Sequence, residues 1–187
     1  MYNGNFHLTR STRTRVQQLL TKYKEQQLDN RFFEDRSQQL KDLPLLSTDL
    51  SMWLQLTDWD RLHAAFWDMQ AYWSMLEWKR KQLEKEEKEQ MGVHSPRNTL
   101  PQSIKHIQLD LRDLMSQVNS QVSTMSNMNS SWIKPMSAAV QTPSRPESSS
   151  KTVWDSRVEG YIILRDLDLY LTKLARDFLL LASKTHA

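Results

Sequence analysis

The stretch that decides the fold lies near the C-terminus, where residues 153–184 read VWDSRVEGYIILRDLDLYLTKLARDFLLLASK. Its large apolar residues recur every three or four positions, which is the spacing of one face of an α-helix. That face carries Leu164, Leu167, Leu171, Leu174, Phe178 and Leu181. The pattern predicts one long amphipathic helix over about 153–184.

Three earlier stretches show the same helical spacing and are expected to form helices over about 10–29, 58–90 and 101–125. Thr57 and Asp60 have the spacing of a capping box at the start of the second of these. Pro101 suits the first turn of the third. Because no stretch alternates between apolar and polar residues as a strand does, the sequence predicts an all-α fold.

The connections between the predicted helices are long, short and long, at about 28, ten and 27 residues. A long crossover lets consecutive helices run parallel, whereas a short loop joins antiparallel neighbours. The sequence therefore predicts a single four-helix bundle over 1–187 with up-up-down-down topology and two long crossover loops. The last crossover, 126–152, is rich in serine and proline and is expected to be mobile. It contains a sequon for N-glycosylation at Asn129.

Composition argues against several classes of protein. The net charge of +3 is spread along the chain, so nucleic-acid binding is not expected. Three glycines do not suffice for a glycine-rich phosphate loop, and without cysteine there is no disulfide. No run of 18 apolar residues occurs, so no membrane insertion is expected. The five histidines show no ligand spacing, and we expect no catalytic, cofactor-binding or metal site and no enzyme.

Residues 53–62 (WLQLTDWDRL), residues 109–114 (LDLRDL) and the last predicted helix are three segments that together resemble one family. They are similar to the interleukin-6/interleukin-12 group of helical cytokines, and most closely to its interleukin-27 type of alpha subunit. Residues 53–62, WLQLTDWDRL, resemble the segment that leads into the second helix of that type, and 109–114, LDLRDL, resemble a run in its third helix. The last helix matches without a gap at Trp154, Tyr161, Leu164, Leu167, Leu169, Leu171, Arg176, Asp177, Leu179, Leu180, Leu181, Ser183 and Lys184. The long loops do not match, and serine, proline and threonine replace an acidic run in the last crossover.

The resemblance implies a secreted, extracellular alpha subunit. It would pair with a soluble receptor-like beta subunit and engage class I cytokine receptors, including the shared glycoprotein 130 chain. In that family, site 1 uses the end of the first crossover and the C-terminal part of the last helix. Site 2 uses the first and third helices, and site 3 an aromatic residue at the start of the last helix.

Two other functions remain open. One is a single-chain cytokine of the leukaemia-inhibitory or ciliary-neurotrophic type, in which the site 3 aromatic is usually Phe followed by Lys. In this chain the corresponding residues are Trp154 and Asp155, which favours the interleukin-27 type. The other is an intracellular helical-bundle adaptor, which the lack of an apolar leader in residues 1–5 would suit. An apolar leader upstream of Tyr2 would exclude the adaptor.

Apolar residues that lie off the predicted core faces mark candidate binding residues. We assign Trp53, Leu169, Lys173, Arg176 and Leu180 to site 1, Lys105, Leu109 and Arg112 to site 2, and Trp154 and Val158 to site 3. The structural alternatives are that the first crossover covers the leucines of the last helix and that Trp53 and Trp154 staple loops to the bundle. Leu109 would then be a lone surface leucine.

The helix expected over 58–90 is apolar on two sides. Opposite its core face lie Trp67, Ala71, Met75 and Trp78. We expect the first crossover to cover this second side with Phe32, Phe33, Leu45 and Leu46. The alternative is a second partner surface.

Overall fold

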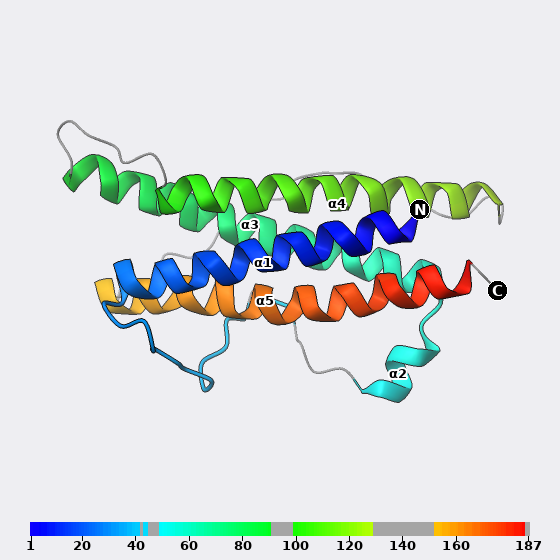
Figure 1. Ribbon diagram of the computed structural model, residues 1–187, viewed down its shortest axis with the longest axis horizontal. Coiled ribbons are helices and arrows are strands. Elements are labelled where there is room, and N and C mark those ends of the chain that lie inside the picture. The colour runs from blue at the N-terminus through cyan, green and yellow to red at the C-terminus, as the bar shows by residue number, and fades with distance from the viewer. Residues whose placement is uncertain (42, 45–48, 91–98, 129–151, 186–187) are drawn as a thin grey trace.

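The computed structural model describes residues 1–41, 43–44, 49–90, 99–128 and 152–185. Within these ranges the chain is all-helical: α1 (Tyr2–Gln27), α2 (Leu50–Gln55), α3 (Asp58–Gln90), α4 (Leu100–Met128) and α5 (Val153–Lys184). The four long helices lie alongside one another as a bundle, and α2 lies beside the end at which α3 begins (Figure 1). None of the described helices is long and apolar enough to cross a membrane.

α1 packs against α5 and α4. The Tyr23 hydroxyl, near the end of α1, donates a hydrogen bond to the carbonyl oxygen of Arg157 near the start of α5, at 2.6 Å. Ten residues earlier, Arg13 Nε bonds to Oδ1 of Asp168 at 3.0 Å, further along α5. α1 and α5 are therefore antiparallel.

Contacts with α4 place α1 antiparallel to that helix as well. Asn5 Nδ2 donates to Oε1 of Gln121 at 2.9 Å, and Arg15 Nη1 donates to Oδ2 of Asp110 at 2.7 Å. The start of α1 thus lies beside the later part of α4. The Asn5 amide is buried, so its hydrogen bond offsets the cost of removing it from water.

α3 packs against α4 and α5 and runs antiparallel to α5. Near the end of α3, Lys79 Nζ donates to the carbonyl oxygen of Ser156 at 2.9 Å. At the other end, Lys184 Nζ lies 2.7 Å from Oδ1 of Asp58. The Tyr72 and Tyr170 rings stack between these ends at a centroid distance of 5.1 Å.

Three of the long helices lie close to their expected bounds, and α1 differs most. It begins at Tyr2 instead of near residue 10, because its first half turns polar side chains inward. Asn5, Thr9 and Thr12 are buried, and the Thr9 and Thr12 hydroxyls bond to carbonyl oxygens one turn earlier. An apolar spacing cannot reveal a helix whose inner face is polar.

α5 forms the centre of the core. Its six predicted core residues are all between 0 and 2% exposed. Thr152 and Asp155 form a capping box at its start, with Thr152 Oγ1 accepting from Asp155 N at 3.1 Å. Of the segment predicted to be a mobile crossover, 126–128 belong to α4, Thr152 caps α5, and the remainder, including Asn129, lies outside the described residues.

Candidate partner-binding surfaces

α2 exposes apolar side chains that the core does not use. Leu50 and Met52 are each 68% exposed, and Leu54 is 58% exposed. Asp49 caps the start of the helix, and its carboxylate accepts a hydrogen bond from Ser51 N at 2.9 Å. A helix of six residues is too short to be stable by itself in water, so contacts with the bundle must hold it.

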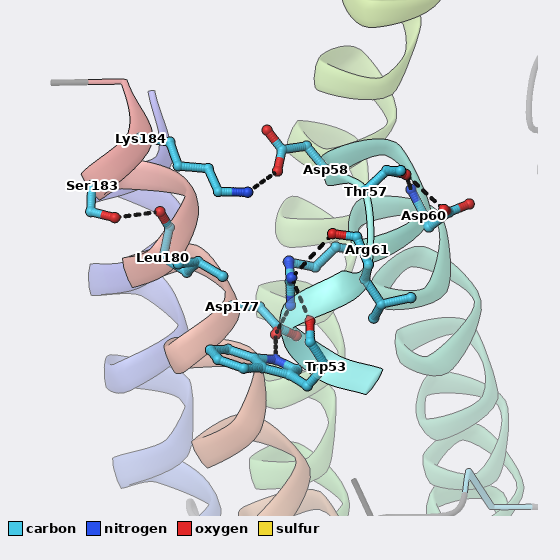
Figure 2. A network of polar contacts seen from close by, with 10 residues as sticks. Trp53, Thr57, Asp58, Asp60, Arg61, Asp177, Leu180, Ser183 and Lys184 are labelled. Atoms are coloured by element: carbon cyan, nitrogen blue, oxygen red, sulfur yellow. Dashed lines mark hydrogen bonds and ion pairs between the residues drawn. The ribbon is translucent and has the colours of Figure 1, made fainter. Parts of the chain in front are cut away.

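The side chain of Trp53 anchors α2 to α5. Its indole Nε1 donates to Oδ1 of Asp177 at 2.5 Å, and the guanidinium of Arg61 lies 4.9 Å from the centre of its ring (Figure 2). Arg61 Nη1 bonds to the same Asp177 oxygen at 3.2 Å, and its Nη2 donates to the Trp53 carbonyl oxygen at 2.7 Å. Three residues from α2, α3 and α5 thus form one polar network, which we call the Trp53–Arg61–Asp177 network.

Burial makes this network sensitive to the loss of any member. The side chains of Arg61 and Asp177 are 1% and 7% exposed. Burial raises the pKa of the Asp177 carboxyl, while the Trp53 hydrogen bond and the charges of Lys173 and Arg61 oppose that increase. Removing one member of a buried ion pair commonly costs about 3–5 kcal/mol, because its partner remains uncompensated.

Outside the network, the end of α5 is tied to the start of α3. Lys184 pairs with Asp58, and Thr57 Oγ1 accepts a hydrogen bond from Asp60 N at 3.1 Å, as the capping-box spacing predicts (Figure 2). These contacts are solvent-exposed, so each contributes less than the buried network.

The structure brings several expected site 1 residues to this end of the bundle. Trp53 contacts Asp177, which lies one residue from Arg176 and one helical turn from Lys173 and Leu180. Arg176 is exposed and Leu180 is partly buried. Part of the first crossover, α2, therefore packs on this face of α5, and Arg176 remains exposed beside it.

Leu169 lies apart from the other site 1 residues. It precedes Leu180 by eleven residues, or about 16 Å along a helix. Its side chain is 53% exposed and lines a groove of about 740 Å³, together with Leu40, Leu43 and Pro44 of the segment that follows α1. Leu169 thus borders the first crossover, at a distance from the Trp53–Arg61–Asp177 network.

The expected site 2 residues do not lie where the resemblance implies. Arg112 lines a groove with Phe66 and Trp73 of α3, whereas α4 contacts α1 through Asp110 and Gln121. Lys105 and Leu109 are exposed on the same side of α4 as Arg112. A surface shared by α1 and α4 therefore does not include Arg112, because 100° per residue turns it toward α3.

The structure divides the expected site 3 residues. Trp154 is 48% exposed, and its ring packs edge-to-face on Phe33 at a centroid distance of 6.0 Å. Phe33 packs in turn on Tyr161 at 5.0 Å. Val158 is only 5% exposed, so its assignment to a binding surface is wrong. It lies one turn after Trp154, on the side of α5 that enters the core.

The expected cover of the second apolar side of α3 is also wrong for the described residues. Phe32 is 85% exposed and Phe33 packs on α5, whereas Leu45 and Leu46 lie outside the described residues. The side is not uniform, since Met75 is 5% exposed and Trp67 is 43% exposed. α3 packs against both α4 and α5, so its buried face is wider than a single stripe. Met75 belongs to this buried face, and Trp78 is partly buried.

The sequence did not predict α2, its exposed leucines or the pairing of Arg61 with Asp177. The sequence offers little signal for this pair, because Arg61 and Asp177 lie about 100° around their helices from the core residues Leu62 and Phe178. Charged residues are rarely fully buried unless they are paired, so only the structure reveals this ion pair. No group of histidine, aspartate or glutamate side chains in the described part of the chain could hold a metal ion.

Comparison with models of known protein families finds no family that matches the chain. Comparison with curated proteins finds no match either.

Proposed function

We propose that the chain is a helical cytokine alpha subunit of the interleukin-6/interleukin-12 group, closest to the interleukin-27 type. It pairs with a soluble receptor-like beta subunit and, in that complex, engages class I cytokine receptors that include glycoprotein 130. The observation that carries the proposal is the surface formed by α2 and the C-terminal part of α5. We call it the α2/α5 surface; its residues are Leu50, Met52, Trp53, Leu54, Lys173, Arg176 and Leu180.

The α2/α5 surface has the composition of a protein interface. Leu50, Met52 and Leu54 project from a helix that is fixed in place by Trp53. Leu50 and Leu54 lie one turn apart on the same side of α2, and Met52 lies on another side. Exposed apolar side chains gathered on one element mark interaction sites in soluble proteins. Arg176 adds a guanidinium, and arginine is enriched in interfaces. The surface therefore suits a partner that buries it when the heterodimer forms.

We include in the proposal an up-up-down-down topology with two long crossovers. Its support is the antiparallel packing of α1 with α4 and α5 and of α3 with α5. The lengths of the connections predicted from the sequence agree with this arrangement. We also propose that the protein is secreted, as the beta subunit and the receptor ectodomains are extracellular.

Co-expression with candidate receptor-like beta chains, followed by size-exclusion chromatography of the secreted product, tests the pairing. We expect a heterodimer with one such chain. Met52→Asp combined with Leu54→Asp should weaken it by at least about a hundredfold, because two charges would have to be buried in the interface.

Leu109→Asp is the control, since it places one such negative charge on an exposed leucine of α4, outside the α2/α5 surface. We expect it to pair normally. Both proteins should keep the helicity of the parent, as the substituted residues are exposed. Equal pairing by the α2 variant and the Leu109 variant, or no pairing with any receptor-like chain, would contradict the proposal.

A further inference from the structure

A groove between α3 and α4 lies on a different part of the bundle from the α2/α5 surface. Its volume is about 330 Å³. Phe66 and Met115 are 5% and 7% exposed and form its apolar base, and Trp73 is partly buried beside them. The polar side chains that line it, including Gln70 and Arg112, carry no negative charge.

Arg112 is an exposed cation without a counterion at the edge of this groove. Among the described residues it forms neither an ion pair nor a hydrogen bond. On α4, the residues one turn away on either side are the uncharged Gln108 and Ser116. Glu77 of α3 is already bound to Arg80 at 2.6 Å and to Gln108 at 2.9 Å. The groove therefore combines an apolar base with an uncompensated positive charge.

The apolar surface extends beyond the groove on both helices. On α3, the ring of Trp67 packs edge-to-face on Phe66 at 5.5 Å, and its side chain is 43% exposed. On α4, Leu109 lies one turn before Arg112 and is 39% exposed. Tryptophan and arginine are the residue types most often found at the energetic centre of protein interfaces. Trp67 and Arg112 are both exposed in this region of α3 and α4.

We propose that this groove binds a segment of a second protein partner that carries a large apolar side chain next to an aspartate or glutamate. The apolar side chain would insert against Phe66, Trp73 and Met115, and the carboxylate would pair with Arg112. A guanidinium binds a carboxylate with two parallel hydrogen bonds, so Arg112 selects for the acidic residue. A polypeptide also covers Trp67 and Leu109 on either side of the groove, which a small ligand would leave exposed. This inference does not depend on the proposed cytokine function.

Selection of random peptides displayed on phage against the purified full chain tests the inference. We expect the enriched peptides to share a large apolar residue close to an acidic residue. Their affinity should fall by at least about tenfold on Arg112→Glu, because the mutation replaces attraction with repulsion. A peptide whose acidic residue is replaced by lysine should regain affinity for the Arg112→Glu protein and lose it for the parent. That exchange identifies the pair of charges directly.

Lys85→Glu makes the same change of charge at an exposed position of α3, twelve residues beyond the groove residue Trp73, and should leave peptide binding unchanged. Arg112→Gln is a milder variant and should lower affinity in the same direction if Arg112→Glu does not fold. Three results would overturn the inference: enriched peptides without an acidic residue, equal binding to both Arg112 variants and the parent, or self-association of the parent that Arg112→Glu abolishes. The last would make the occupant a second copy of this chain.

Discussion

The indole nitrogen of Trp53 lies 2.5 Å from Oδ1 of Asp177, although 124 residues separate them in the sequence. A hydrogen bond to an ionised, buried carboxylate contributes more than one between neutral groups. Since Trp53 is the residue of α2 that contacts α5 in this way, this bond determines where α2 and its exposed leucines lie. The α2/α5 surface depends on it.

Trp53→Phe should detach α2 while leaving the bundle folded. The substitution keeps a smaller aromatic ring but removes the indole N–H donor, and loss of that hydrogen bond should cost about 1.5–3 kcal/mol. We expect faster amide hydrogen exchange in residues 50–55 and unchanged exchange at the centre of α5. Trp59→Phe is the control, because the buried Nε1 of Trp59 has no hydrogen-bond partner in the described residues. Equal exchange rates in the two variants would show that the Trp53 bond does not hold α2.

The close contact of α5 with Tyr23 and Lys79 should make Gly160→Ala destabilising. An added Cβ would lie 2.6 Å from both Tyr23 Cζ and Lys79 Cε, inside normal van der Waals contact. Forcing an extra methyl group into a packed core commonly costs about 1–3 kcal/mol, more than alanine gains over glycine in a helix.

Gly4→Ala provides the opposite case in α1, where an added Cβ meets no atom within 4 Å. Here only the helix propensity changes, so we expect a gain of about 0.5–1 kcal/mol. Urea denaturation of both variants measures the two effects. A Gly160→Ala protein as stable as Gly4→Ala would contradict the packing of Tyr23 over Gly160.

The partly buried carboxyl of Asp68 should make stability depend on pH. Burial raises its pKa above the ordinary value of 3.8, Lys173 opposes the increase and Asp177 adds to it. The folded chain therefore holds this proton more tightly than the unfolded chain. The contribution of Asp68 to stability is fully present below pH 3.8 and is lost as the pH rises through the raised pKa.

Asp68→Asn removes this dependence, because the amide is neutral at every pH. The free energy of unfolding of the parent, relative to that of Asp68→Asn, should fall as the pH rises from about 4 toward neutrality. Thermal denaturation between these values measures the difference. Asp113→Asn, on exposed α4 surface, corrects for the change in net charge. If the stability of the parent relative to Asp68→Asn rises with pH over this range, the environment favours the ionised form of Asp68.

Trp154→Ala should separate receptor engagement from folding. The side chain is half exposed and packs on Phe33, so its loss should cost about 0.5–1.5 kcal/mol from the aromatic pair. We expect normal pairing with the beta subunit and a loss of signalling through glycoprotein 130. Truncation of a tryptophan at the centre of an interface typically costs at least about 2 kcal/mol of binding energy.

A reporter cell line that carries glycoprotein 130 and the second receptor measures this effect. Phe33→Leu is the informative companion, because it weakens the support of the Trp154 ring and leaves the ring in place. It should reduce signalling less than Trp154→Ala. Full signalling by a folded Trp154→Ala protein would exclude Trp154 from the receptor contact.

Apolar spacing was sufficient to predict the all-helical fold and where α3, α4 and α5 lie, because their inner faces consist mainly of leucine, isoleucine, valine and aromatic residues. Those faces repeat every three to four residues whatever the partner helix is. The spacing also separated exposed Leu169, Leu109 and Trp154 from the core. It could not recognise the first turns of α1, where buried Asn5, Thr9 and Thr12 bond to a neighbouring helix or to their own backbone.

Only the tertiary structure decided which charged residues lie inside and which apolar residues lie outside. Arg61 and Asp177 can be buried because helix packing brings these two residues, 116 positions apart in the sequence, within 3.2 Å of each other. Neither residue's own helix indicates that partner. Likewise, Val158 enters the core and Arg112 faces α3 because of the way the helices rotate against their neighbours. Helical periodicity predicts which residues share a face of a helix, and packing between helices determines what that face contacts.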